Sequence, residues 1–211
     1  LAPGEAAGAA ELAALQSVGF DAAALSNLGG PGTAYAHAAS LTRYRARVYD
    51  ADWAAERGAT DRASETVGDV FADFEGARAH EALEEADHDA YESFEGGLSD
   101  LRSAVESGDA EARASALSAV DSALLSGIEA LVGPDGRAVL ESAFFRARLA
   151  DANERYRLGD GAAAAAATRS LFQRFESDEA RFHEFLEETS EDLYHRFEEE
   201  HLVALVSAYE N

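Results

Sequence analysis

Glutamate and histidine residues recur at helical spacing in two stretches of the sequence. FADFEGARAHEALEEADHDAYESFEGGL, residues 71–98, and FQRFESDEARFHEFLEETSEDLYHRFEEEHL, residues 172–202, both place acids and histidines between aromatic residues. Carboxylate oxygens and imidazole nitrogens that project from neighbouring helices can hold iron, zinc or manganese inside a bundle. The pattern therefore indicates either a metal site or the solvated face of an acidic helix.

The candidate metal ligands of each stretch are spaced to share one helix face, because residues three or four apart lie on the same side of a helix. In the second stretch they are Glu176, Glu179, His183 and Glu187. In the first stretch the matching set is Glu75, His80 and Glu84. Two Glu-x-x-His pairs, Glu85 with His88 and Glu198 with His201, have the spacing of di-iron ligands, but they are not equivalent between the stretches.

The same residues also have structural interpretations. The histidines can be boundary residues bonded to a neighbouring carboxylate, and the paired glutamates can be a solvated face. Glu75 and Glu176 follow a core aromatic, and each can cap a helix end, pair with Arg45 or Arg146, or bind a metal. The aromatic residues that we expect only to pack are Tyr91, Tyr194 and Trp53.

An internal repeat relates the two stretches. Residues 45–75 align without a gap with residues 146–176 at ten identical positions, and both segments contain RAR and FxxFE. After a two-residue insertion, HEALEEADHDAYESFE (residues 80–95) aligns with HEFLEETSEDLYHRFE (residues 183–198) at nine identical positions. The sequence therefore predicts a duplication, and an all-α helical bundle built from two duplicated helical units with pseudo-twofold symmetry.

Helix formers dominate the chain, and apolar residues recur at helical spacing. The predicted helices are Glu5 to Ser17, Thr33 to Arg57, Thr60 to Glu75, Arg78 to Ser107, Ala110 to Leu131, Arg137 to Leu158, Gly161 to Glu176 and Asp178 to Tyr209. Further breaks are expected at Ala86-Asp87 and Thr189-Ser190. The residues expected to be buried between the copies are Phe71, Phe74, Phe94, Phe172, Phe175 and Phe197.

The predicted organisation has three parts. Residues 1–30 form an N-terminal helical segment that resembles the tail of a preceding unit, residues 31–133 form the first repeat, and residues 134–211 form a second, truncated repeat. We expect these parts to form one compact domain. The chain begins with Leu and contains no Met, so we expect it to belong to a longer protein.

The charge of the chain indicates the conditions in which the protein works and the partners that it can bind. Forty-one acidic residues face seventeen basic ones, all of them Arg, and the net charge is -24. The acidic side chains repel one another at low salt, and concentrated salt screens this repulsion. Such an acidic composition is typical of a protein from an extreme halophile. The net negative charge argues against binding of nucleic acid through a basic patch. The absence of Cys excludes disulfides and thiolate metal sites, and no apolar run has the length that membrane insertion requires.

The second copy resembles a known group of domains. YRLGD (residues 156–160) followed by FQRFESDE (residues 172–179) is similar to the helical extracytoplasmic domains of high-affinity iron permeases and, more remotely, to imelysin-like proteins. The whole chain resembles a secreted haloarchaeal helical-repeat domain of unknown function. In the first copy, Ala55 replaces the Tyr, Ala59 replaces the Asp, and Arg78 stands where a second Glu is expected. A site implied by the resemblance is therefore better supported in the second copy.

Two functions follow from these observations. In the first, the chain is a non-catalytic extracytoplasmic domain that binds iron or another divalent metal for uptake or redox chemistry; the resemblance implies as partner a membrane permease or a cupredoxin-like module of the same longer chain. In the second, it is a structural or protein-interaction repeat without a metal site. An enzyme is not expected, because the sequence has no phosphate loop, nucleophile elbow or HExxH motif.

Overall fold

The computed structural model describes residues 32–178 and 180–210. The elements in these residues are all helices, which confirms the prediction of an all-α helical bundle. The predicted helix from Glu5 to Ser17, and with it the segment 1–30, lies outside the described residues. The chain divides into two compact units, Leu1–Gly136 and Arg137–Asn211, which are described separately. The duplication and its symmetry stay predictions.

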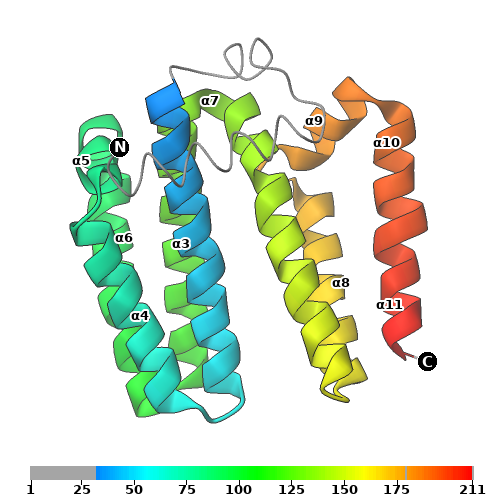
Figure 1. The fold of residues 1–211 in the computed structure, drawn as a ribbon, viewed down its shortest axis with the longest axis horizontal. Helices are drawn as coiled ribbons and strands as arrows, with labels where there is room; N and C mark the ends of the chain where they lie inside the picture. Colours follow the sequence, from blue (N-terminus) through cyan, green and yellow to red (C-terminus); the bar gives the residue numbers. More distant parts are fainter. Residues whose placement is uncertain (1–31, 179, 211) are drawn as a thin grey trace. The chain divides into compact units, whose positions relative to one another are not determined.

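The first unit is a bundle of successive helices (Figure 1). They are α3 (Gly32–Glu56), α4 (Thr60–Glu75), α5 (Arg78–Ala86), α6 (His88–Ser107) and the part of α7 (Ala110–Arg157) that precedes Arg137. The predicted helix from Arg78 to Ser107 is therefore two helices, and the break expected at Ala86-Asp87 is confirmed. Asp87 makes this break, because its carboxylate accepts a hydrogen bond from the Ala90 N–H and so caps α6.

Gly133 and Pro134 kink α7 where the sequence GPDG predicts a break. Gly133 has φ 75° and ψ 173°, a conformation outside the helical region that a residue without a Cβ adopts readily. Pro134 lacks the N–H that a continuous helix needs. The two helices predicted on either side are thus joined into one element of 48 residues with a kink inside it.

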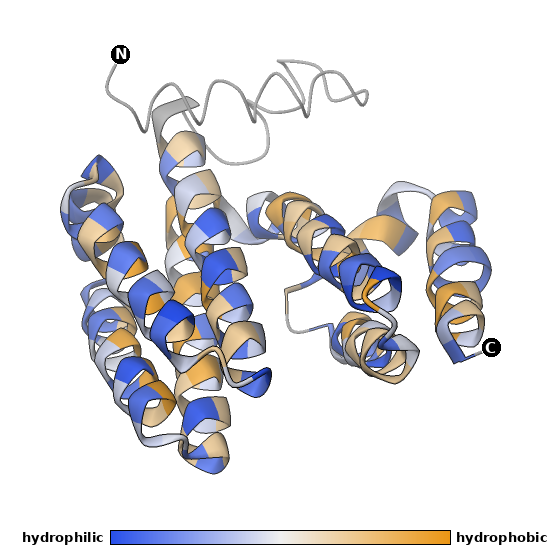
Figure 2. Ribbon diagram, turned by 60° about the horizontal axis from the view of Figure 1, so that its bottom comes forward, coloured by the Kyte–Doolittle hydropathy of each residue, from blue (hydrophilic) through white to orange (hydrophobic). Residues whose placement is uncertain are grey.

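The first part of α7 is a core helix. The sequence predicts no apolar run long enough for membrane insertion, but by length and composition α7 could cross a membrane. However, 56% of its most apolar window is buried inside the protein. Val120 packs against Gly97 of α6, and Gly127 approaches Leu83 of α5 closely. Figure 2 shows hydrophilic and hydrophobic residues interleaved along the helices, the pattern of amphipathic helices that share a core.

An ion pair is buried between α3 and α7. The Nε of Arg45 donates a hydrogen bond of 2.7 Å to Oδ1 of Asp121, and the two side chains are 1% and 6% exposed. Arg45 therefore pairs with Asp121, and the suggested pairing of Arg45 with Glu75 is not what the structure has. A charged pair at this depth is retained only with close geometry, which the short bond provides.

The prediction of which phenylalanines are buried is partly wrong. Phe74, Phe94 and Phe175 are buried, but Phe71 is 40% exposed. On α4 the buried stripe consists of Ala63, Val67, Val70 and Phe74. Phe71 lies one position beyond Val70 on the helix, about 100° further round, and so leaves the stripe. Phe172 and Phe197 are half-buried.

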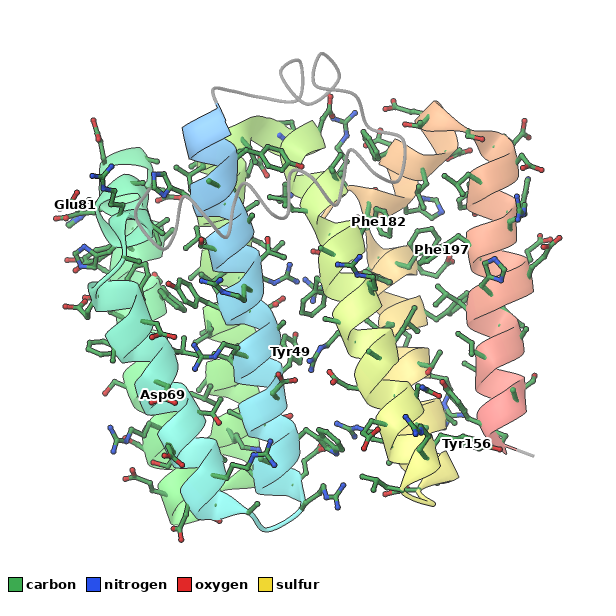
Figure 3. The ribbon with its side chains drawn as sticks, viewed as in Figure 1. Tyr49, Asp69, Glu81, Tyr156, Phe182 and Phe197 are labelled. Atoms are coloured by element: carbon green, nitrogen blue, oxygen red, sulfur yellow. The ribbon has the colours of Figure 1, made fainter. Side chains whose placement is uncertain are left out.

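The second unit has shorter elements in its C-terminal half. After the end of α7 it contains α8 (Gly161–Ser177), α9 (Phe182–Thr189), α10 (Glu191–His195), the π-helix η1 (Arg196–Leu202) and α11 (Val203–Glu210). The break expected at Thr189-Ser190 is confirmed, and the capping side chain is that of Ser190, which accepts a hydrogen bond from the Leu193 N–H. Phe182 and Phe197 point toward one another with ring centres 5.6 Å apart (Figure 3), and Phe145 and Phe175 complete this aromatic core.

Candidate metal centre

Three helices of the first unit bring the candidate residues together. Glu75 is the last residue of α4, and His80 lies in the first turn of α5, after a short connection at Gly76 and Ala77. Tyr91 and Glu95 lie one turn apart on α6, whose start is fixed by the Asp87 cap. The cluster depends on the two chain breaks, because they turn α5 and α6 back toward the end of α4.

Glu75, His80 and Glu95 form a group that could hold a metal ion. One ligand atom from each lies within 4.8 Å of the others. Nε2 of His80 is 3.3 Å from Oε1 of Glu75 and 3.8 Å from Oε1 of Glu95. Ligands held about 2.1 Å from a tetrahedral ion lie about 3.4 Å apart, which is close to the His80–Glu75 distance and shorter than the His80–Glu95 distance.

Burial and hydrogen bonds control the ionisation of the group. Burial raises the pKa of the Glu95 carboxyl, and a hydrogen bond with Glu75 raises it further because two carboxyl groups can share a hydrogen bond only when one is protonated. The pKa of Tyr91 rises to about 12, through burial and then through its hydrogen bond to the Glu95 carboxylate. A cation placed among these carboxylates would remove the repulsion between them.

Aromatic packing orients the imidazole ring of His80. Its Nε2 lies 3.1 Å from the hydroxyl oxygen of Tyr91, and its ring centre is 5.1 Å from that of Phe74. Phe74 is fully buried, so the histidine ring packs against a side chain that the core holds in place. Two carboxylates and one imidazole form a nitrogen and oxygen ligand set that suits iron, zinc and manganese.

In the second unit the predicted ligand His183 makes a contact with a tyrosine, as His80 does in the first unit. Nε2 of His183 lies 3.2 Å from the hydroxyl oxygen of Tyr194. A hydrogen bond to Glu198 raises the pKa of Tyr194 to about 12, and burial adds to the shift. Glu176, at the end of α8, is exposed. The backbone N–H of His183 donates to Oδ1 of Asp178 at 2.8 Å, across a connection that is two residues longer than the one between α4 and α5.

Other predicted ligands stand apart from these clusters. Glu84 and Glu187 are exposed, one turn after the histidines of α5 and α9, and their charges contribute to the raised pKa values of Tyr91 and Tyr194. Glu179 lies outside the described residues.

The histidines of the two Glu-x-x-His pairs are exposed. The exposed His88 lies 3.5 Å from Glu92 on its own helix, and His201 is exposed.

Sequence reasoning did not select Glu95, and it treated Tyr91 as a packing residue only. Tyr91 does pack, with its ring 6.2 Å from that of Phe74, but its hydroxyl also links His80 to Glu95. A signal for Glu95 was present: it closes the second aligned block, repeats the Phe-Glu pair and lies four residues after Tyr91.

Comparison with known proteins gives a family but no characterised relative. No curated protein and no solved structure matches the chain. One family model covers residues 1–211. The chain belongs to the family described as Domain of unknown function (DUF5059).

Proposed function

We propose that the first unit binds a divalent transition-metal ion through Glu75, His80 and Glu95. The observation that carries the proposal is the convergence of two carboxylates and one imidazole, from three helices, within 4.8 Å. A solvated acidic face would spread its carboxylates apart, whereas here the half-buried Glu95 faces another carboxylate. Iron is the first candidate, since the resemblance to iron-permease domains points the same way as the ligand set.

The test is titration of the purified chain, freed of metal by a chelator, in molar salt. Ferrous, zinc and manganese ions are added in turn and heat and ion content are measured. Glu95→Gln should weaken the tightest binding by roughly tenfold or more, because it removes a ligand charge and leaves the shape unchanged. His80→Gln should have the same effect.

Glu92→Gln is the matched control. Glu92 lies on the same helix, its side chain is 68% exposed, and it is outside the triad. Its removal should leave the affinity unchanged. Equal binding by wild type, Glu95→Gln and Glu92→Gln would show that the ions are held only by the general charge of the surface, and the proposal would be wrong.

A specific observation favours a second candidate function, that of a structural or protein-interaction module. The histidine and tyrosine contact occurs at 3.1 Å in the first unit and 3.2 Å in the second, in each case against a buried phenylalanine. A contact of this kind stabilises the helical hairpin of the metal-free protein. Loss of stability in His80→Gln together with an absence of stoichiometric binding would support this candidate.

The proposal also includes the salt conditions, the cellular location and the partner of the protein. The net charge of -24 without any Lys supports a haloarchaeal protein that works in concentrated salt. The resemblance to permease domains supports an extracytoplasmic location, without membrane insertion of this chain, and a permease or cupredoxin-like module as partner. Fractionation of cells that express the full-length protein tests the location, and circular dichroism across a salt series tests the dependence on salt.

A further inference from the structure

Residues 110–132 of α7 close the bundle of the first unit and are called the closing helix. On α3, Arg45 donates a hydrogen bond of 2.7 Å to Asp121 of this helix. Arg113 of the closing helix in turn donates a hydrogen bond of 2.6 Å to Asp52 of α3. Arg45 and Asp52 therefore lie on the side of α3 that the closing helix covers.

The corresponding side of the second part of α7 is exposed. The aligned repeats equate Arg45 with Arg146 and Asp52 with Asn153. Arg45 is 1% exposed beneath the closing helix, whereas Arg146 and Asn153 are both exposed. Among the described residues, the second part of α7 thus lacks the cover that α3 has.

The same difference is found between α6 and the continuous helix of α10, η1 and α11. The buried Leu98 lies four residues after an aligned phenylalanine in α6, and the buried Leu202 lies five residues after its counterpart, because the wider turn of η1 adds one residue. The residues before these leucines, Gly97 and His201, therefore correspond to one another. Gly97 is buried against Val120 of the closing helix, whereas His201 is exposed.

The last helix of the second unit, α11, exposes apolar side chains. Val203 is 48% exposed, and Ala204 and Ala208 are also exposed. The sequence of α11 contains one acidic residue, Glu210, and no Arg, in a chain whose net charge is -24. An apolar face on so acidic a protein indicates a surface that another segment covers.

The segment before α3 is poor in charge. Residues 1–31 contain three of the 41 acidic residues and none of the 17 Arg. Within the segment, Leu15, Val18, Ala22 and Leu25 have the spacing of one face of a helix. The sequence therefore predicts a helix that packs on a protein surface through this face.

This segment also resembles the closing helix. LQSV (residues 15–18) is similar to LSAV (residues 117–120), whose leucine and valine are buried. A Gly-Pro pair follows in each case, at Gly30-Pro31 and at Gly133-Pro134. The segment thus has the sequence features of the helix that the described residues of the second unit lack.

The connection within α7 indicates which unit the segment joins. The boundary between the units, after Gly136, lies within α7, and its Gly133-Pro134 kink separates a helix of the first unit from a helix of the second. Gly30-Pro31 precedes α3 in the same way. Because α3 belongs to the first unit, a helix before this pair would join the second.

We propose that residues 12–28 pack as a helix on the second unit of the same chain, over Arg146, Asn153 and the exposed side of α11. There they take the place that the closing helix has in the first unit. A helix of these residues is about 25 Å long and fits along residues 191–210, which span about 30 Å. Burial of Val203 and of the apolar face of the segment drives the association, which does not depend on metal binding.

The absence of Cys from the chain makes disulfide formation a direct test. Val18 corresponds to Val120 and His201 to Gly97, and Val120 contacts Gly97. The full chain with Val18→Cys and His201→Cys should therefore form a disulfide within the monomer under mild oxidation, detected by the loss of free thiols and by the mass of the unreduced protein. Gln16→Cys with His201→Cys is the matched control and should form none, because residue 16 lies about 200° round the helix from residue 18.

Hydrogen exchange provides a second test that requires no cysteine. Leu15→Asp places a charge in the covering face, so the amides of residues 203–210 should exchange at least about tenfold faster than in wild type. Gln16→Asp carries the same charge on the other side of the helix and should leave these rates unchanged. Circular dichroism in molar salt checks that all variants keep the helix content of wild type.

A disulfide within monomers, together with faster exchange in Leu15→Asp alone, supports the proposal. A disulfide that joins two chains would show that the segment comes from a second copy, and would overturn the arrangement within one chain. No disulfide above that of the Gln16→Cys control, with exchange at residues 203–210 that Leu15→Asp leaves unchanged, would mean that the segment does not cover the second unit. The exchange result decides alone if the cysteine pair lowers the helix content.

Discussion

His80 and Tyr91 share a hydrogen bond of 3.1 Å across the break between α5 and α6. The bond fixes the imidazole beside Glu75, while the same hydroxyl is hydrogen-bonded to Glu95. Tyr91 therefore positions two of the three proposed ligands without belonging to the triad. This relationship makes the ionisation of the tyrosine a direct measure of the state of the cluster.

Alkaline titration should show that the protein loses stability between pH 10 and pH 12. The pKa of Tyr91 is raised from 10.0 to about 12 in the folded chain, and that of Tyr194 likewise. Between these values the folded state holds protons that the unfolded state has released, so the free energy of unfolding falls as the pH rises. Absorbance of tyrosinate against pH, with melting curves at each pH, measures both effects.

The double variant Tyr91→Phe, Tyr194→Phe is the control for that titration. It should lack the late ionisation, and its melting temperature should fall less steeply above pH 10. A decline as steep as that of wild type would show that other groups cause the alkaline loss.

Glu95→Gln should stabilise the metal-free protein at neutral pH, although it is expected to weaken metal binding. Burial and the neighbouring Glu75 raise the pKa of Glu95, so its ionised form is unfavourable in the folded state. A raised pKa contributes stability at acidic pH that is lost as the pH rises through the folded value, and glutamine avoids this loss. We expect the melting temperature to rise by roughly 1–3 °C at pH 7, and a fall would contradict this account of the site.

The helices and their breaks could be predicted from the sequence because they depend on local residues. Asp87 and Ser190 cap helices through their own side chains, and Gly133 with Pro134 interrupts α7 through backbone geometry. Such signals act within a few positions of the chain. The same reasoning failed for Phe71, since burial depends on which side of the helix faces the bundle.

The ligand set was only partly predictable, because spacing rules compare residues on one helix. Glu84 is four residues from His80 on α5, which suggested a shared site, yet it is exposed. Glu95 reaches the same histidine from another helix after the chain turns at Asp87. Sequence spacing does not contain the angle of that turn, so convergence from separate helices required the structure.

Breaking the buried pair between Arg45 and Asp121 should be among the most damaging single changes in the first unit. Asp121→Ala leaves the arginine charge buried without its 2.7 Å partner, and we expect a loss of about 3–5 kcal/mol in the free energy of unfolding. The double variant Arg45→Met, Asp121→Leu should recover part of this loss. Denaturant titrations in molar salt measure both.

The exposed pair of Arg102 and Glu106 provides the comparison for the buried one. These side chains are 56% and 53% exposed at 2.9 Å, and Arg102→Ala should cost less than about 1 kcal/mol. Equal losses at the two pairs would mean that burial does not determine the energetic role of Arg45.

Gly127→Ala should disturb the metal centre from a distance. A Cβ at Gly127 would lie 2.2 Å from Cδ1 of Leu83, which is fully buried on α5, the helix that carries His80. The overlap must move Leu83 or α5 itself, and overpacking of this kind costs about 1–3 kcal/mol, more than alanine gains as a helix former.

Gly96 provides the control, because nothing lies within 4 Å of a Cβ there and Gly96→Ala should stabilise α6 by up to about 1 kcal/mol. Because α5 positions the histidine, Gly127→Ala should also weaken manganese binding in the first unit, whereas Gly96→Ala should not. Unchanged affinity in a destabilised Gly127→Ala variant would show that the contact between α5 and α7 supports the fold without positioning the ligands.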